Sequence, residues 1–257
     1  MSAAVRASDG HGLVGPDLDG RGLVGPVRRP GLARWCHGVL AVLCLTACLV
    51  SFYIGATRPS ELLPGAGFST TFPQGWRHMA NQPFFFTWMS NALVGVTSLL
   101  LVINPGRRST AFQVVRLSGL ICLIITGVVF NVLLRSNAEM TLLETAQDAA
   151  QHITTPILAP LLWVLFGPRG QVTWRRIGLS MIIPIAWLLV TLVRGSLIDW
   201  YPYIILDVPG QGWARVMALV GAILVFYLLV GAVLWWLDRV LGRGSALGRD
   251  HLEQLAD

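Results

Sequence analysis

The stretch FFFTWMSNALVGVTSLLLVI, residues 84–103, decides the fold class of this chain. It has no charged side chain, and about 20 apolar residues are enough to cross a bilayer as an α-helix. Its first turns nevertheless contain Thr87, Ser90 and Asn91, whose i, i+3, i+4 spacing places them on one helical face. In lipid such a polar face needs hydrogen-bonding partners from elsewhere in the fold, so this stretch also indicates where a functional site would lie.

The composition is typical of a protein that crosses the membrane several times. Hydrophobic residues make up 54% of the 257 residues and charged residues 12%, whereas soluble domains contain about 25% charged residues. All 19 basic residues are arginines, and most lie in short segments between apolar runs. Topology and anionic lipids explain this pattern better than nucleic acid does, so we predict no nucleic-acid partner.

Six apolar segments reach spanning length, which predicts an all-α, polytopic membrane protein with a six-helix transmembrane bundle. They cover about residues 35–55, 83–103, 113–134, 150–167, 177–195 and 214–238. The fourth segment is short and contains Pro156 and Pro160, which we expect in its opening turns, where a missing N–H costs least. Alternatively, this helix begins earlier, in the polar run 138–151, which is rich in helix formers.

The arginines also predict an orientation. The spans form one domain, residues 35–241; residues 1–34, rich in Arg, Gly and Pro, are expected to be a disordered tail, and 242–257 a C-terminal tail. Of the arginines, 14 lie on the side of the termini and five on the other. The positive-inside rule then places both termini in the cytoplasm of a multi-pass protein of the plasma (inner) membrane.

Most polar side chains at helix depth lie toward the predicted outer side. They are Thr87, Ser90, Asn91, Asn131, Arg135, His152, Thr154, Thr155 and Arg194, and the loop after the fifth span adds Asp199, Tyr201, Tyr203 and Asp207. Polar groups at membrane depth tend to face the bundle interior or a wet cavity, so we predict a pocket that opens outward. The inner half offers little beyond Arg116.

Each of these residues also has a structural explanation. Ser and Thr in membrane helices often bond the carbonyl four residues earlier, and Asn often bridges two helices. Arg135 and Arg194 lie at helix ends, from which an arginine can snorkel to lipid headgroups. Asp207 is either an ordinary loop carboxylate or a counter-ion for Arg194. A single histidine near the interface is often no more than a hydrogen-bonding residue.

The neighbours of His152 favour a catalytic role. Asp148 lies four residues earlier on the same helical face, where its carboxylate would orient the imidazole, and Glu144 continues that face. An oriented histidine beside a hydroxyl such as that of Thr87 is the minimum needed for nucleophilic acyl transfer. The same three side chains would also be metal ligands, but no HExxH motif or second inward histidine accompanies them. We therefore predict neither a metal nor a cofactor.

Four motifs resemble a prokaryotic family of six-span membrane proteins. They are FFFTWMSN (84–91), DAAQHITTP (148–156), LFGPRG (165–170) and RG…DWYPYIILDV (194–208), and the resemblance extends over roughly 35–241. That family distantly resembles the androgen-induced transmembrane hydrolases of animals, which have six spans, a threonine early in the second and a histidine in the fourth. The animal proteins lack the arginine-rich tail, and WYPYIILDV has no match in them.

The resemblance implies a threonine hydrolase that cleaves fatty acid esters of hydroxy fatty acids. By motif, Thr87 would be the nucleophile and His152 its partner. The substrate would enter laterally from the outer leaflet. Ser90, Asn91 or a backbone N–H would stabilise the oxyanion. Asp148 would orient His152, and the remaining pocket residues would be Asn131, Thr155, Arg194, Asp199, Tyr201 and Asp207.

Two other functions fit the same residues. One is a non-catalytic binder or transporter that holds a lipid or small amphiphile in the outer pocket. No span has a carboxylate in its middle and no half-helix repeat is visible, which disfavours an ion or proton carrier. The other is a structural partner of a second membrane protein. The hydrolase and the binder both make membrane lipids or lipid esters the expected partners.

Overall fold

The computed structural model describes residues 30–135 and 139–254 of the chain, so most of the predicted N-terminal tail lies outside the described residues. In the described part, all the regular elements are helical, and six helices are long and apolar enough to cross a membrane. This result confirms the predicted all-α class and the predicted six helices of spanning length, and it is compatible with an integral membrane protein.

The first three spans are α1 (Pro30–Thr57), α3 (Phe86–Ile103) and α4 (Thr110–Val129), which continues into the π-helical turn η2 (Phe130–Leu134). The fourth span runs through α5 (Leu142–Ala149), the π-helical η3 (Ala150–Thr154) and α6 (Thr155–Phe166). The fifth consists of α7 (Trp174–Ser180) and α8 (Ile182–Ile198). The sixth, α10 (Trp213–Gln254), continues through most of the segment 242–257 that we predicted as a tail.

The fourth span begins in the polar run before the apolar segment, as the alternative prediction had it. Thr141 caps it, because its backbone N–H and hydroxyl both donate to the Glu144 carboxylate, over 2.8 and 2.7 Å. Pro156 does lie in the first turn of α6, but α6 continues a run that starts at Leu142, so the two prolines do not occupy the opening turns of the whole span. Both prolines lie well inside the run, and the π-helical turn η3 ends two residues before Pro156.

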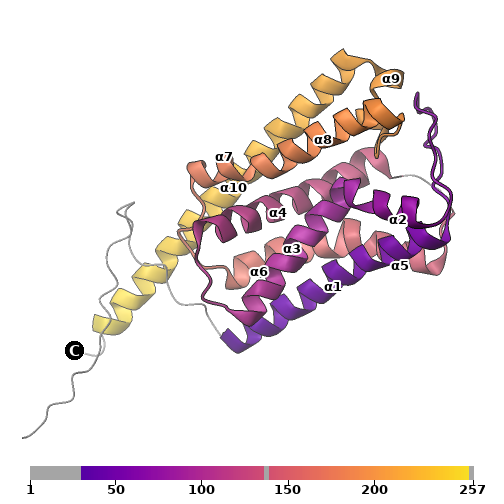
Figure 1. Cartoon of the computed structure of the whole chain (residues 1–257). Helices are drawn as coiled ribbons and strands as arrows, with labels where there is room; N and C mark the ends of the chain where they lie inside the picture. The colour runs from indigo at the N-terminus through magenta and orange to yellow at the C-terminus, as the bar shows by residue number, and fades with distance from the viewer. Residues whose placement is uncertain (1–29, 136–138, 255–257) are drawn as a thin grey trace, which may run out of the picture.

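Helix α4 lies at the centre of the bundle. It contacts α3, α6, α7, α8 and α10, and Figure 1 shows α1, α3 and α6 on one side of it and α8 and α10 on the other. Its residues Ile121, Cys122 and Leu123 are completely buried. By contrast, large apolar side chains on the outside of the bundle, such as Val132 and Leu197, are 73% and 77% exposed, as expected of a surface covered by lipid.

The two ends of the bundle differ in character. At the arginine-rich end, α1, α4 and α7 begin and α3 and α6 end; the far end of α10 lies on the same side (Figure 1). At the loop-covered end lie the loops 58–75 and 199–212. The short elements of this end are α2 (Trp76–Asn81), η1 (Gln82–Phe84), η4 (Ile204–Leu206) and α9 (Val208–Gln211).

Direct hydrogen bonds join the two loops. The backbone N–H and hydroxyl of Ser69 donate to the Asp199 carboxylate over 2.8 and 2.7 Å. The fully buried Asp207 carboxylate accepts from the backbone N–H groups of Gly67 and Gly210. Gly67 lies against the Gly210 backbone so closely that no Cβ would fit. The loop-covered end is thus a fixed layer above the start of α3.

Candidate active site

Thr87 lies in the first turn of α3. Phe85 has an extended backbone and occupies the N-cap position of this helix. The N–H groups of a first helical turn have no acceptor within their own helix. The N–H of Thr87 donates instead to the hydroxyl oxygen of Tyr203, over 3.2 Å. The side chain of Thr87 is 7% exposed, so it is shielded from the surroundings of the bundle.

The hydroxyl of Thr87 faces His152. Its Oγ1 lies 3.2 Å from His152 Nε2, and His152 Nδ1 lies 2.7 Å from Asp148 Oδ1. Since a carboxylate accepts, Nδ1 carries the proton and the lone pair of Nε2 points at the Thr87 hydroxyl. Thr87 and His152 therefore lie within hydrogen-bond reach, which the sequence alone could not show, and Asp148 contacts His152 at the i, i+4 spacing. The three side chains form a hydrogen-bonded series of a hydroxyl, an imidazole and a carboxylate, the same kinds of group that are bonded in series in a catalytic triad.

Further contacts hold the imidazole and its carboxylate. Arg135 donates to Asp148 over 3.3 Å and, through Nε and Nη2, to the side-chain oxygen of Asn131. The ring of Phe130 stacks on the His152 ring with a centroid distance of 3.4 Å and an interplanar angle of 5°. Both rings lie on π-helical turns, which are frequent at functional sites. Glu144 is not part of this group, because its carboxylate pairs with Arg58 and caps α5.

Asn131 connects the two π-helical turns. Its amide nitrogen donates to the backbone carbonyl of Gly127 over 2.7 Å and to that of His152 over 2.8 Å. Pro156, four residues after His152, has no N–H to offer the His152 carbonyl. Asn131 supplies a donor to this carbonyl, and it thereby ties the backbone at His152 to the end of the third span.

The other predicted polar residues of α3 lie behind Thr87. Asn91, completely buried, donates to the Thr87 carbonyl over 2.9 Å and accepts from the Thr155 hydroxyl over 2.8 Å. The Ser90 hydroxyl lies 2.7 Å from the Phe86 carbonyl and 2.9 Å from the Thr126 hydroxyl. These side chains fasten the first turns of α3 to α4 and α6. Their donors are directed at protein groups, so they support Thr87 from behind.

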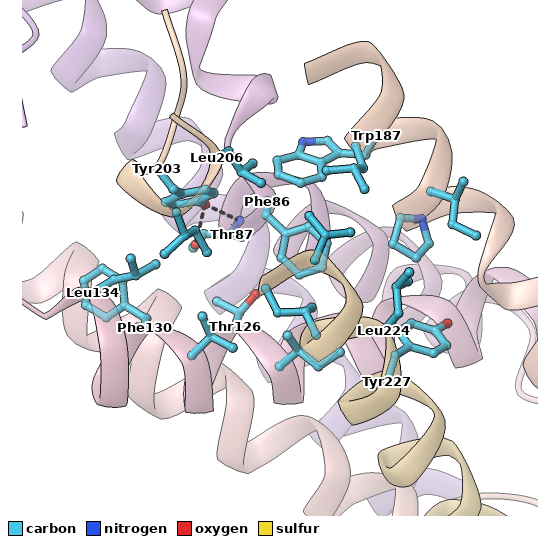
Figure 2. A pocket seen from close by; sticks show the side chains of 18 residues that line it. Phe86, Thr87, Thr126, Phe130, Leu134, Trp187, Tyr203, Leu206, Leu224 and Tyr227 are labelled. Atoms are coloured by element: carbon cyan, nitrogen blue, oxygen red, sulfur yellow. Dashed lines mark hydrogen bonds between the residues drawn. The ribbon is translucent and has the colours of Figure 1, made fainter. Parts of the chain in front are cut away.

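An apolar cavity lies on the other side of Thr87. Its volume is about 90 Å³, several times the roughly 15 Å³ that one water needs. It is enclosed by α3, α4 with η2, α8, α10 and the loop 199–212, and Figure 2 shows Thr87 and Tyr203 together on its wall. Its polar lining is limited to the hydroxyl groups of Thr87, Thr126, Tyr203 and Tyr227 and the indole N–H of Trp187, which donates to the Phe84 carbonyl.

Tyr203 lies at the site, although nothing in the sequence distinguished it from the other residues of its loop. Its hydroxyl lies 3.3 Å from Thr87 Oγ1, and its oxygen receives the Thr87 N–H, with the N–H of Phe86 also close. Burial raises the pKa of Tyr203, so the hydroxyl stays protonated at neutral pH and remains a donor. The sequence feature that could have indicated this residue is the pair of tyrosines in WYPY, Tyr201 and Tyr203. Of the two, Tyr203 contacts Thr87.

The remaining predicted pocket residues lie in or beside the loop layer. Arg194 lies over the rings of Phe84, Phe72 and Trp200, at 4.0, 5.9 and 5.1 Å from their centroids. Asp199 and Asp207 bind the loops together, as described above. Tyr201 packs on Phe68 and against Gly195. The structure therefore brings Asn131, Asp148, His152 and Thr155 to Thr87, and it gives Arg194, Asp199, Tyr201 and Asp207 other partners.

Within the described residues, no group of three His, Cys, Asp or Glu side chains is arranged to hold a metal ion. Comparison of the chain with protein-family models, with curated proteins and with solved structures gives no match. The class of protein is therefore defined by the fold alone: the described residues form six helices long and apolar enough to cross a membrane, which is compatible with an integral membrane protein. The Thr87–His152–Asp148 series, with Thr87 buried and the other two partly buried, is the feature from which a function can be argued.

Proposed function

We propose that this protein is an intramembrane hydrolase of lipid esters with Thr87 as its nucleophile. One observation carries the proposal: a hydroxyl, an imidazole and a carboxylate are hydrogen-bonded in series, and the hydroxyl, that of Thr87, lines an apolar cavity within the helix bundle. A buried hydroxyl beside an oriented imidazole is the arrangement that activates a weak nucleophile. A fatty acyl chain is the kind of group that the apolar lining suits.

In the first half of the reaction, Thr87 Oγ1 attacks the ester carbonyl carbon while its proton passes to His152 Nε2. The resulting imidazolium is stabilised by Asp148. His152 then gives this proton to the alkoxide oxygen as the ester C–O bond breaks, so the alcohol leaves and the acyl group stays on Thr87. In the second half, His152 takes a proton from water, the hydroxide attacks the acyl carbon, and the proton returns to Thr87 as the fatty acid leaves.

Tyr203 and the start of α3 would stabilise the oxyanion. The N–H groups of a first helical turn favour negative charge, and here they point at the Tyr203 oxygen. A hydroxyl that accepts such bonds is a stronger donor. Its O–H can turn from Thr87 Oγ1 to the oxygen of the tetrahedral intermediate. This assignment replaces Ser90 and Asn91, whose bonds to protein groups leave them behind Thr87.

The position of the cavity supports lateral access from lipid. Ile185, on its wall, is 37% exposed on the outside of the bundle. By the arginine asymmetry we place the loop-covered end, and with it Thr87, on the outer side of the plasma membrane. The resemblance of FFFTWMSN and DAAQHITTP to threonine hydrolases agrees with this reading, and it names the esters of hydroxy fatty acids as the first substrates to try.

The test is hydrolysis of fluorogenic and branched fatty-acid esters by the purified protein and its variants. Thr87→Ala and His152→Ala should each lower kcat/KM by roughly a thousandfold or more. Thr97→Ala is the matched control, because this buried hydroxyl of α3 donates to the Leu93 carbonyl of its own helix. Rapid quenching followed by peptide mass analysis should find the acyl group on Thr87.

Full activity in either variant would remove the pair from the mechanism. Absence of turnover in a well-folded wild type that co-purifies with lipid would favour the alternative, a non-catalytic lipid or amphiphile binder. In that case the same cavity would hold the ligand, and Thr87→Ala would leave the amount of bound lipid unchanged.

A further inference from the structure

A second, smaller cavity lies at the arginine-rich end, on the opposite side of the bundle from Thr87. Its walls come from the starts of α1 and α4 and the ends of α3 and α6: Ala33, Arg34, His37, Leu101, Pro105, Arg116, Phe166 and Pro168. Its volume is about 10 Å³, which is enough for one water-sized group. The proposed hydrolase makes no use of these residues.

His37 has an unused polar atom in this cavity. The residue is 6% exposed, and its Nδ1 is buried without a hydrogen-bond partner. Most buried polar atoms in proteins do have a partner, because an unpaired one costs free energy. A ring nitrogen of this kind points to a group that is supplied from outside the chain.

Arg116 lines the same cavity, and its positive charge has no counter-ion among the described residues. This partly buried side chain lies one turn and a half into α4, and no hydrogen bond or ion pair joins it to the described part of the chain. The positive charge of Arg169 is close enough to repel it. The buried carboxylate at this end, that of Asp238, already accepts from the backbone N–H groups of Gly170 and Val172, over 3.0 and 2.8 Å.

Arg34 completes the group at the mouth of the cavity. Its Nε donates to the Val102 carbonyl over 2.9 Å, which holds the long side chain across the start of α1 and the end of α3. The surroundings add positive charge: Arg107, Arg108, Arg175, Arg176 and Arg239 also lie at this end. Among the described side chains of this end, basic groups thus far outnumber the one carboxylate.

We infer that this cavity binds a phosphate group. One phosphate oxygen would enter between His37 and Arg116, accepting from both, and the rest of the group would remain at the mouth beside Arg34. Arginine and a protonated or neutral Nδ1–H are suitable donors for phosphate oxygens, and charge-assisted bonds of this type are strong. The phosphate belongs either to the headgroup of an anionic lipid or to a free phosphate, because both present the same oxygens.

The test measures the thermal unfolding of the full-length protein with three probes. Inorganic phosphate is added to the protein in a non-ionic detergent, and nanodiscs are made from phosphatidylcholine alone or with phosphatidylglycerol. Arg116→Gln and His37→Gln are compared with Arg175→Gln, an exposed arginine of the same end that removes the same charge away from the cavity. We expect a saturable rise in Tm for wild type and for Arg175→Gln. In the two cavity variants the apparent affinity should be about tenfold weaker.

The arms separate the two sources. A response to inorganic phosphate assigns a free phosphate, and a response only to phosphatidylglycerol discs assigns the lipid headgroup; either one supports the site if the cavity variants lose it. An equal response in Arg175→Gln and Arg116→Gln would overturn the proposal, since surface charge alone would explain it. No response in wild type to any probe would also overturn it and leave His37 facing a single water.

Variants that fail to fold would be recognised by size-exclusion profile. Arg116→Lys then serves as the second variant, because it keeps the charge and loses the forked geometry. It should bind more weakly than wild type and more tightly than Arg34→Gln combined with His37→Gln. Ester hydrolysis should be unchanged in all of these variants, so failure of this site and failure of the proposed hydrolase are told apart.

Discussion

The side-chain amide of Asn131 donates a 2.8 Å hydrogen bond to the backbone carbonyl of His152. This carbonyl belongs to the residue four positions before Pro156, which has no N–H to offer it. The bond links the end of the third span to the catalytic candidate on the fourth, and it explains how a proline can follow His152 within a helix. His152 is thus held by its backbone through Asn131 and by its ring through Asp148 and Phe130.

Replacing Asn131 should therefore affect both stability and catalysis. Asn131→Leu leaves the His152 carbonyl without this donor, which should cost about 1–3 kcal/mol of unfolding free energy. We expect kcat for ester hydrolysis to fall by about tenfold, with KM little changed, because the imidazole loses its position and the cavity does not change. Asn104→Leu is the control. Asn104 is an exposed asparagine at the arginine-rich end of the bundle, and its side-chain oxygen accepts from the backbone N–H of Gly106. Unchanged kcat and Tm in Asn131→Leu would contradict this role.

Asp148 should act through His152. Asp148→Asn keeps the size of the side chain but removes the charge that stabilises the imidazolium, so kcat should fall by roughly 10³–10⁴-fold. Glu144→Gln is the matched control on the same helix, because the Glu144 carboxylate pairs with Arg58 and caps α5. Measuring kcat across a range of pH would distinguish the Asp148→Asn variant from the Glu144→Gln control. If Asp148→Asn kept the activity and pH profile of wild type, Asp148 would have only a structural role.

Tyr203 should contribute through its hydroxyl group alone. Tyr203→Phe keeps the ring, which packs edge-on against Phe85, and removes the donor beside Thr87. Loss of one oxyanion donor typically lowers kcat by about 10²-fold or more, and KM should change little. Tyr227→Phe is the control, since this tyrosine also lines the cavity but bonds Ser180, over 2.7 Å. Equal losses in both variants would mean that cavity packing, rather than oxyanion stabilisation, explains the effect.

The contact between the two loops should weaken in acid. The hydroxyl and backbone N–H of Ser69 hold the pKa of Asp199 below its usual value of 3.8. A carboxylate with a lowered pKa stabilises the folded state above the unfolded pKa, and this contribution disappears as the pH falls through the folded pKa. The Tm difference between wild type and Asp199→Asn should therefore be constant above about pH 4 and shrink below it.

Thermal unfolding in detergent between pH 2.5 and 6 would measure this difference. Glu61→Gln, which changes an exposed carboxylate of the same loop 58–75, provides the comparison. Its Tm should follow that of wild type across the range. A Tm difference for Asp199→Asn that does not vary with pH would show that the Ser69 contact makes no ionic contribution.

The sequence was most informative where one helix decides the geometry. Helical spacing placed Asp148 beneath His152, because residues four apart share a face whatever the rest of the fold does. Likewise, long uncharged runs determined the six spans, since backbone groups in lipid must bond within their own helix. The sequence did not reveal the π-helical turn at Ala150–Thr154. This turn nevertheless preserves the i, i+4 contact between Asp148 and His152.

Only the tertiary structure could decide contacts between distant segments. Asn131 and the His152 carbonyl, Tyr203 and Thr87, and Asp207 and Gly67 are pairs whose members lie on different helices or loops, and no local spacing relates them. The polar residues of the outer half were predicted as one group, and packing divided them into the Thr87 site and the loop layer. The reason is physical: periodicity determines which face of a helix is polar, whereas the neighbour that this face meets depends on how all six helices pack.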